Sequence, residues 1–407
     1  MGACSSLSNS NKLNGCARHK IPGTIADSFC SRVKVDNSVL TTVPRDVFVC
    51  VFLPYMTMTD LVKLDSALNC AVWADEIRAR VREIVWSEDE VVTIGNMAKE
   101  AWFLSRSIYP INLRMFSGMN DDEIRKKTEI AKFARIVSLS YCWMLSPRAV
   151  GSFLHACGRV SVLNLSFCTV NFTVLESISQ HCPVLRRLIL CNSQRLSCQG
   201  LCSVLEWCIY LEELDISMSS GLSFIGTLEV MEKSRGLSSL KMSGLKSVHN
   251  TTLIRLVRSV PDLTALDVSH CAHAIGGMAL LPLSRCRALQ YLNIACEHYL
   301  GTIDSWVTVL AKGCPELWHL DMSGYTFLGD AGISALAQHC QHLTSLSLDR
   351  CLTINSSSLL ILAEHCVALT EISCIDCPHI TMEEVNEFHR SYARGKTCRV
   401  IYGRTNI

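Results

Sequence analysis

The sequence lacks the features that mark membrane-spanning proteins and the common enzyme classes. Its longest apolar run near the start, residues 47–56, is far shorter than the roughly 20 residues that a membrane-spanning helix needs. The first 40 residues contain no apolar core of a signal peptide. No G-x-x-x-x-G-K-[ST], G-x-S-x-G or H-E-x-x-H motif occurs. We therefore expect a cytoplasmic, non-catalytic protein without a cofactor.

The chain also has no large net charge of either sign. The formal net charge is only +1 over 407 residues. The last segment, 391–407, has four basic residues and no acidic ones, but this excess is too small to indicate a nucleic-acid partner. We expect 391–407 to be a basic C-terminal cap or tail, in which 398–403 forms a last strand.

What the sequence does have is a repeat, and a fixed period bears on every later interpretation. The phrase "LTALDVSHC" at 263–271 returns as "LTSLSLDRC" at 343–351. Eleven copies can be followed, and eight of the ten steps between them are 26 residues long. The copies begin at Ile108, Ala134, Val160, Leu185, Leu211, Leu237, Leu263, Leu289, Leu317, Leu343 and Leu369.

Each copy pairs a short alternating strand with an amphipathic helical segment, such as 359–369. The pattern L-x-x-L-x-L-x-x-C followed by a helix is that of a leucine-rich repeat. One unit cannot bury its apolar face alone, so the units must stack and leave a parallel sheet on the concave side. The fold class predicted is an α/β leucine-rich-repeat solenoid, a right-handed horseshoe of about eleven repeats of about 26 residues, with cysteine-containing repeats over 134–390.

Cysteine follows the same period. Of 23 cysteines, twelve occupy two repeat positions, one ending the strand phrase and one three residues before the next phrase. The first set is Cys142, Cys168, Cys271, Cys351 and Cys377, and the second is Cys157, Cys182, Cys208, Cys286, Cys314, Cys340 and Cys366. A free thiol packs as a small hydrophobe with a weak S–H donor, which suits a tight turn near an unpaired carbonyl.

A zinc site is the alternative for one cluster of thiols. Cys374, Cys377 and His379 have a metal-like spacing, with His365 and Cys366 nearby. However, Cys374 falls on an inward strand position and Cys377 on the repeat cysteine position. We therefore expect structural thiols and no metal, and free cysteines are the economical expectation for a reducing compartment.

Residues 1–40 form a disordered basic tail in this interpretation, with a net charge of +3. Gly2 and Ser6 meet the pattern M-G-x-x-x-[ST] for N-myristoylation, and Cys4 is placed to accept a palmitoyl chain. One acyl chain gives marginal membrane binding, whereas a second chain or a basic patch makes the anchor stable. Such an anchor would hold the protein at the cytoplasmic face of a membrane. An unmodified tail remains the alternative.

Residues 41–88 do not fit the repeat and contain signals for three short helices. Pro44 suits the first position of a helix, and Asp46 in its first turn complements the helix dipole. A second helix is expected from Thr59 and a third over 74–86. Residues 89–133 are expected to hold linker helices and the first degenerate repeat.

This helical segment resembles an F-box, which typically has L-P-x-E-V-L-x-x-I-F, then D-L, then V-C-x-x-W. The matching residues are Val43-Pro44, Asp46-Val47-Phe48, Val51-Phe52, Asp60-Leu61 and Cys70 to Trp73. Val replaces the leading Leu, Asp replaces Glu, and extra residues occur near Leu53-Pro54 and before Cys70. An F-box followed by these repeats resembles the F-box/leucine-rich-repeat family, cysteine-containing subclass, over about 41–400.

The resemblance implies a substrate-recognition subunit of a Skp–cullin–F-box ubiquitin ligase. The F-box would dock a Skp-type adaptor, and the repeats would hold a target protein near the ligase. The family's adaptor-facing or helix-packing positions correspond here to Pro44, Val47, Phe48, Val51, Phe52, Asp60 and Leu61. Two alternatives remain: a helical cap that binds no adaptor, and a membrane-tethered scaffold that works without a ligase.

The outward strand positions form a polar, mildly acidic stripe. A partner with basic or hydrogen-bonding groups fits it, although each residue alone is equally consistent with a solvated strand face. Aromatic residues on a polar face are the better binding candidates, and the 28-residue repeat adds residues near them. The candidate contacts are Glu213, Asp215, Asp267, Tyr291, Trp318, His319, Asp321 and Asp349.

Overall fold

The computed structural model describes residues 92–94, 111–271, 277–392 and 397–403. The chain divides into two units, Met1–Ile84 and Val85–Ile407, and all described residues belong to the second. The predicted F-box-like module 41–88 and the tail 1–40 therefore lie outside the described residues.

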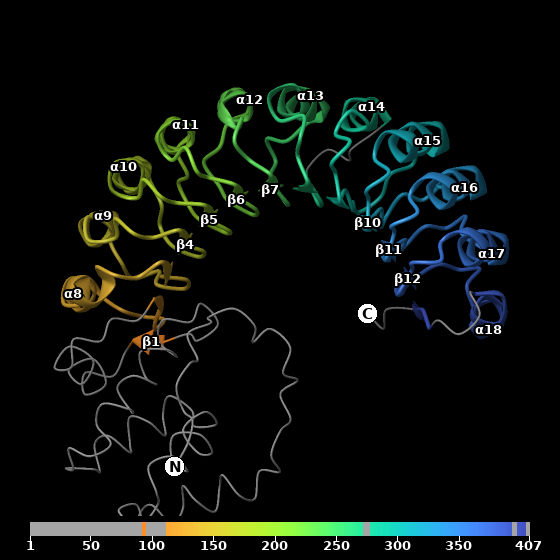
Figure 1. The fold of residues 1–407 in the computed structure, drawn as a ribbon, viewed down its shortest axis with the longest axis horizontal. Helices are drawn as coiled ribbons and strands as arrows, with labels where there is room; N and C mark the ends of the chain where they lie inside the picture. The colour runs from red at the N-terminus through yellow and green to blue at the C-terminus, as the bar shows by residue number, and fades with distance from the viewer. Residues whose placement is uncertain (1–91, 95–110, 272–276, 393–396, 404–407) are drawn as a thin grey trace, which may run out of the picture. The chain divides into compact units, whose positions relative to one another are not determined.

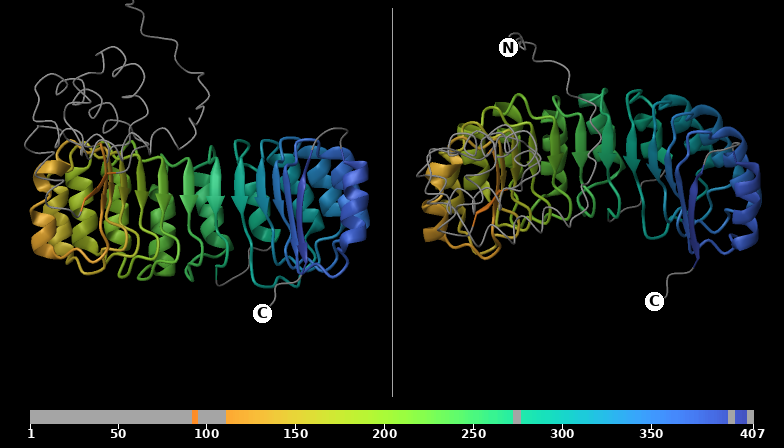
Figure 2. Two further views of the ribbon diagram at one scale, coloured as in Figure 1. Left: turned by 90° about the horizontal axis from the view of Figure 1, so that it is seen from below. Right: turned by 60° about the horizontal axis from the view of Figure 1, so that its bottom comes forward.

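One parallel sheet runs through the second unit. Its 13 strands are hydrogen-bonded in the order in which they occur in the chain, and Figures 1 and 2 show them side by side along the inner side of an arc. The strands are β1 (Val92–Ile94), β2 (Asn112–Met115), β3 (Ile136–Ser138), β4 (Val162–Asn164), β5 (Arg187–Ile189), β6 (Glu213–Asp215), β7 (Ser239–Lys241), β8 (Ala265–Asp267), β9 (Tyr291–Asn293), β10 (His319–Asp321), β11 (Ser345–Ser347), β12 (Glu371–Ile375) and β13 (Arg399–Gly403).

Helices cover the outer side of the same arc (Figure 1). They are α7 (Asp121–Arg125), α8 (Thr128–Ala131), α9 (Pro147–Leu154), α10 (Phe172–His181), α11 (Cys198–Trp207), α12 (Phe224–Lys233), α13 (Asn250–Ser259), α14 (Gly277–Leu283), α15 (Asp304–Gly313), α16 (Asp330–His339), α17 (Ser356–His365) and α18 (Met382–Ser391). Many begin at a side chain that accepts a hydrogen bond from the first turn, as Ser146, Asn171, Ser197, Ser223 and Thr381 do. The leucine-rich-repeat solenoid predicted from the period is confirmed.

The core lies between sheet and helices. The middle residue of each three-residue strand from β3 to β11 is apolar and buried, for example Leu214, Leu266 and Leu320, all at most 1% exposed. Helix residues such as Val230 and Leu336 pack toward them and are fully buried. Because strand side chains alternate between faces, the first and third residues of these strands point to the concave side.

The repeat cysteines cap backbone carbonyls of neighbouring repeats. The thiols of Cys168 and Cys377 donate to Leu139 and Leu348 at 3.1 Å, each 29 residues earlier in the chain. At the helix ends, the Cys340 thiol donates to the Cys314 carbonyl at 3.7 Å. Desolvation by burial raises the pKa of Cys340 to about 12 and that of Cys168 to about 11, so these two thiols stay protonated at pH 7. The prediction of thiols as weak donors in tight turns is confirmed.

The turn that follows most strands has one residue with positive φ. It lies three residues beyond the strand end at Gly118, Tyr141, Phe167, Asn192, Met218, Gly244, His270, Gly324 and Arg350, and one residue beyond the end of β12 at Asp376. At Gly324 the requirement is also steric, because a Cβ atom would lie 2.0 Å from the Cys296 carbonyl oxygen. The turn directs the chain away from the sheet toward the next helix.

The first copy needs a correction. Leu113 of β2 lies opposite Val137, which places the start of this copy at Pro110 and not at Ile108. A shift of two residues keeps the same side chains on the same face, so the sequence pattern did not distinguish the two registers. At the other end, β13 confirms the strand predicted within 398–403 and pairs with β12.

Candidate functional site

The concave face of the sheet is built by outward strand residues that form rows across the repeats. The row at the first strand position includes Arg187, Glu213, Ser239, Ala265, Tyr291, His319, Ser345 and Glu371. The row at the third position includes Asp215, Lys241, Asp267, Asn293, Asp321, Ser347 and Ser373. Neighbours in a row lie on adjacent strands, about 4.8 Å apart.

The aspartates of the third-position row also hold the backbone at the strand end. One side-chain oxygen (Oδ1) of Asp215, Asp267 and Asp321 accepts the N–H of the serine two residues later, at 2.9 to 3.0 Å. Asn164 and Asn293 make the same bond. This is the local turn chemistry that short Asx side chains favour. It engages Oδ1 and leaves the second oxygen of each carboxylate directed away from that bond.

The outward residues of β5, β6 and β7, which we call the neutral half, balance their charges. The Arg187 guanidinium donates to both oxygens of the Glu213 carboxylate, at 2.5 and 2.7 Å. On the next pair of strands, Asp215 lies opposite Lys241, which on its other side lies opposite Asp267 of β8. These residues line a shallow hollow of about 270 Å³. Two positive and two negative charges meet there, so the hollow has no net charge.

The outward residues of β8 to β12, which we call the acidic half, differ in two ways. They include the carboxylates of Asp267, Asp321 and Glu371, and Asp349 follows two residues after β11. No lysine or arginine stands at an outward strand position from β8 to β12. Arg399 of β13 lies beyond this half and approaches Glu371 at 3.9 Å. The acidic half therefore has a net negative charge.

An aromatic group interrupts the carboxylates of the acidic half. Tyr291 and His319, opposite each other on β9 and β10, stack with ring centroids 4.4 Å apart and planes 4° apart. Trp318 meets the His319 ring edge-on at 5.9 Å and is 43% exposed. Aromatic side chains that are half-exposed on a polar face are typical anchors of protein interfaces.

Burial sets the protonation state of the stack. It lowers the pKa of His319 below its ordinary 6.5, and the carboxylates of Asp321, Asp267 and Glu371 oppose this without reversing it. Burial and then the Asp267 carboxylate raise the pKa of Tyr291. At pH 7 both rings are therefore uncharged, although three carboxylates act on the imidazole.

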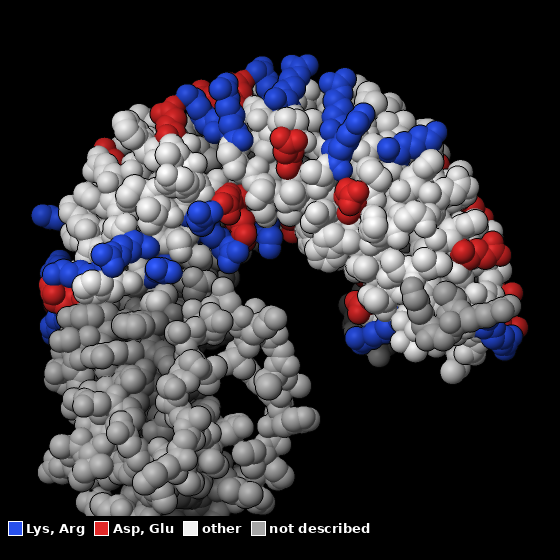
Figure 3. Space-filling model, viewed as in Figure 1, with Lys and Arg blue, Asp and Glu red and all other residues white. Residues whose placement is uncertain are grey.

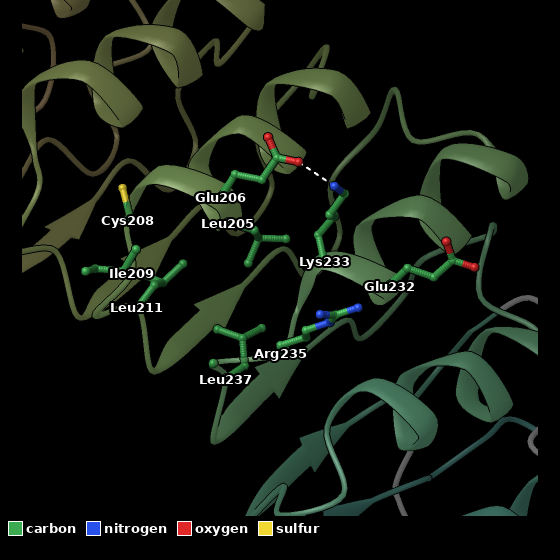
Figure 4. Close-up of a pocket in the computed structure, with 10 residues that line it drawn as sticks. Leu205, Glu206, Cys208, Ile209, Leu211, Glu232, Lys233, Arg235 and Leu237 are labelled. Atoms are coloured by element: carbon green, nitrogen blue, oxygen red, sulfur yellow. Dashed lines mark hydrogen bonds and ion pairs between the residues drawn. The ribbon is translucent and has the colours of Figure 1, made fainter.

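A second hollow lies on the edge where the strands begin. Figure 4 shows it between the end of α11 and the start of β7, with Leu205, Ile209 and Leu237 on its walls. Its volume is about 540 Å³, and a 2.5 Å ion pair between Glu206 and Lys233 bridges its outer side. Opposite charges thus meet across it, and it offers no charge of one sign to a ligand.

The same edge carries a more basic hollow near β3 to β5. Figure 3 shows lysine and arginine side chains on this edge over the first repeats and along the outer side of the arc. Arg135, Arg159, Arg186 and Arg187 line a hollow of about 430 Å³ together with Glu212 and Glu213. Arg186 and Arg187 pair with the two glutamates, and Arg159 lies 5.4 Å from the centre of the Phe133 ring. All four arginines are exposed, so water screens the field of this hollow.

The cluster weighed as a zinc site is buried. Cys374 and Cys377 are 0% and 6% exposed, and the Cys377 thiol already donates to the Leu348 carbonyl. Within the described ranges, no group of three or more His, Cys, Asp or Glu side chains is placed to hold a metal ion. Among the described helices, none has both the length and the apolar character to cross a bilayer.

The structure brings some predicted contact residues together and separates others. Asp267, Tyr291, Trp318, His319, Asp321 and Asp349 lie on four consecutive strands or beside them. Glu213 and Asp215 lie in the neutral half, opposite Arg187 and Lys241. Glu371 also belongs to the acidic half, and it was not among the candidate contacts predicted from the sequence. The lipidation residues Gly2 and Cys4 and the adaptor residues Pro44, Val47, Phe48, Val51, Phe52, Asp60 and Leu61 lie outside the described residues.

No protein-family model matches the sequence, and no curated protein matches it. Solved structures resemble it in fold. Yeast Rad7 in complex with Elc1 is 14% identical, with a TM-score of 0.49 over 94% of this chain and 91% of the other. An internalin, InlF, of Listeria monocytogenes is 13% identical, with a TM-score of 0.45 over 74% of each chain.

TLR13, solved with ssRNA13, is 14% identical, with a TM-score of 0.38 over 72% of this chain and 47% of the other. Identities of 13–14% and TM-scores of 0.38–0.49 are too low for function to be transferred from these proteins.

Proposed function

We propose that this chain is a non-catalytic receptor that binds a target protein on the concave face of its repeats. The observation that carries the proposal is the half-exposed group of Tyr291, Trp318 and His319 on an otherwise polar sheet. A structural role in the core does not account for these rings, because the core is filled by the inward leucines. Rigid aromatic groups at the centre of a polar surface are where protein interfaces concentrate their binding energy.

A photo-crosslinking amino acid tests this proposal by position. One variant carries it at Ser347 on the concave face, and its matched control carries it at Gln338, exposed on α16 on the outer side. We expect a discrete crosslinked protein from Ser347, lost when Trp318→Ala and Tyr291→Ala are added, and none from Gln338. Equal crosslinking from both positions would remove the concave face as the binding surface.

We further propose that the receptor serves a Skp–cullin–F-box ubiquitin ligase. The support is the F-box resemblance of residues 41–88, in which Phe48 and Phe52 match adaptor-facing or helix-packing positions. The test is a pull-down of the intact chain and of the Phe48→Ala/Phe52→Ala double variant. Recovery of the Skp-type adaptor with the wild type alone is the expected result. If neither protein recovers the adaptor, a tethered scaffold without a ligase is the better description.

The N-terminal pattern adds a proposed membrane anchor, with myristate on Gly2 and palmitate on Cys4. Two acyl chains give a far more stable membrane association than one. Labelled myristate should enter the wild type and be absent from Gly2→Ala. Absence of label from the wild type would remove the anchor and leave the receptor proposal unaffected.

A further inference from the structure

The Tyr291–His319 stack rises from the first-position row of the acidic half and separates two parts of the concave face. We call these parts floors: one lies at Ala265 on β8 and the other at Ser345 on β11. Parallel rings on neighbouring strands stack across the strands, so each ring has one face toward its partner and one face away from it. The free face of Tyr291 is toward β8, and that of His319 is toward β11. What occupies the row on β8 and β11 therefore decides whether a ligand can reach these faces.

Both neighbouring positions are small. Ala265 lies opposite Tyr291 on β8, and Ser345 lies opposite His319 on β11. Both residues are half-buried and extend no further than Cβ or a hydroxyl. A flat group that approaches from the concave side finds an aromatic wall and a low floor on each side of the stack.

Each floor also has a carboxylate. Asp267 is two residues beyond Ala265 on β8 and points to the same side of the sheet. On the other side, Asp321 follows His319 on β10, and Glu371 lies opposite Ser345 on β12. Asp267 and Asp321 use Oδ1 for the turn, which fixes their orientation and leaves Oδ2 for a ligand.

We propose that the acidic half binds two arginine side chains of one extended protein segment, one on each side of the Tyr291–His319 stack. This inference rests on the proposed function, in which the concave face binds a protein, and it names the chemistry of the bound segment. A guanidinium group is flat, stacks on aromatic faces and donates charge-assisted hydrogen bonds to carboxylate oxygens. Here the acceptors are Oδ2 of Asp267 and Oδ2 of Asp321, because Oδ1 of each already accepts from a serine N–H and hydroxyl. Each floor offers both partners. No outward residue from β8 to β12 is a lysine or arginine, and the cations that flank this half are Lys241 of β7, opposite Asp267, and Arg399 of β13, opposite Glu371. The neighbours of Asp321 in its row are the uncharged Asn293 and Ser347.

The sheet geometry also sets the spacing of the two arginines. Ala265 and Ser345 are separated by three strand spacings, about 14 Å in total. An extended segment that crosses the strands rises about 3.4 Å per residue, so four residues span this distance. Residues four apart in an extended chain point to the same side. The segment should therefore have the pattern Arg-x-x-x-Arg.

A fluorescent peptide with the sequence Ser-Arg-Ser-Gly-Ser-Arg-Ser is the probe, and fluorescence anisotropy with the full-length protein is the readout. Three peptides accompany it: one with citrulline for both arginines, one with lysine, and one of the same composition with the arginines three residues apart. We expect the probe to bind about tenfold more tightly than the citrulline peptide, because citrulline keeps the flat shape but loses the positive charge, and with it the charge-assisted hydrogen bonds and the cation–π attraction. The peptide with lysine, and the peptide with its arginines three residues apart, should each bind a few-fold more weakly than the probe.

Variants of the protein locate the site. The double variant Asp267→Asn/Asp321→Asn should bind the probe about tenfold more weakly, since each change removes one carboxylate partner. Folding should be kept, because Asn164 and Asn293 already make the same backbone bond at this repeat position. The matched control is Asp262→Asn/Glu316→Gln, which makes the same change of two charges in the exposed loops before β8 and β10. Its affinity should stay within about twofold of the wild type. The affinity of Tyr291→Ala for the probe should be a few-fold lower, although all carboxylates remain in this variant.

Two results would overturn the inference. One is equal binding of the arginine and citrulline peptides; the other is an equal loss in the Asp262→Asn/Glu316→Gln control, which would indicate a general field of the acidic surface. Failure of the peptides combined with crosslinking from Ser347 would remove the arginine pattern and leave the receptor function standing. Peptide binding without crosslinking from Ser347 would remove the receptor function instead.

Discussion

The neutral half and the acidic half of the concave face have the same backbone architecture, but they differ in the charge and the aromatic side chains that they present to a partner. Both place a buried leucine at the centre of each three-residue strand, as Leu214 and Leu320 show. In the neutral half, Arg187 holds the Glu213 carboxylate with two hydrogen bonds. In the acidic half, the Tyr291–His319 stack separates carboxylates that no outward cation of β8 to β12 balances. The fold thus fixes the inward positions and leaves the outward ones to set binding chemistry.

The largest expected effect tests what the two halves have in common. Leu214→Ala and Leu320→Ala should each lower the free energy of unfolding by about 2–5 kcal/mol, because each leaves a cavity between sheet and helices. Urea unfolding followed by circular dichroism measures both. A large loss for one variant and none for the other would show that the halves do not share an equally packed core.

A second pair of substitutions should make the neutral half resemble the acidic half in charge. Arg187→Ser/Lys241→Ser removes the cations that balance Glu213 and Asp215, so the neutral half becomes acidic. Affinity for the arginine peptide should rise by roughly threefold to tenfold at low salt, and most of the gain should vanish at high salt. Anisotropy measures it, with Arg285→Ser/Lys312→Ser as the control that removes two exposed positive charges elsewhere. An equal gain in this control would show that net charge alone decides binding.

Lowering the pH should weaken the binding of the arginine peptide to the acidic half, and by more than protonation of the carboxylates alone would explain. The pKa of His319 lies below 6.5, so the imidazole is neutral at pH 7 and gains a proton as the pH falls through that lower pKa. Asp321, Asp267, Glu371 and the Tyr291 ring face it, and the new positive charge would repel a bound guanidinium. Peptide affinity should be constant from about pH 8 to 7 and fall several-fold toward about pH 5. In His319→Asn the fall should be much smaller, and an unchanged fall would assign it to the carboxylates.

The smallest expected effect concerns the ion pair that neutralises β5 and β6. The Arg187 and Glu213 side chains are 46% and 39% exposed, so solvent screens their attraction. A double-mutant cycle with Arg187→Ala and Glu213→Ala should give a coupling energy of about 0.2–1 kcal/mol, smaller at high salt. A coupling of several kcal/mol would mean that this pair shapes the fold of the neutral half as well as its charge.

Much of the architecture could be predicted from particular residues. Leucines at a period of 26 residues predicted the strands, and β13 was predicted from 398–403. The cysteines were predicted as turn donors, and their thiols do cap carbonyls. The first copy was misplaced by two residues, because a shift of two preserves the alternation of faces and Ile108 fits the pattern as well as Pro110 does.

The site was harder to predict than the fold. Glu213 and His319 occupy the same repeat position in the sequence, yet the neighbour of Glu213 in the row is Arg187 and that of His319 is Tyr291. Arg187 and Glu213 are 26 residues apart in the chain, and the stack of Tyr291 on His319 spans the 28-residue repeat. A partner at such a distance can be named only when the register between the strands is known.

The sequence by itself determined the period, the inward leucines, the turn cysteines and the polar outward positions, because each depends on local alternation repeated along the chain. Only the tertiary structure decided which outward charges cancel and which stay unbalanced beside an aromatic stack. The physical reason is that every outward side chain meets its neighbours one repeat away. Electrostatic and stacking energies fall steeply with the distance that the register between repeats sets.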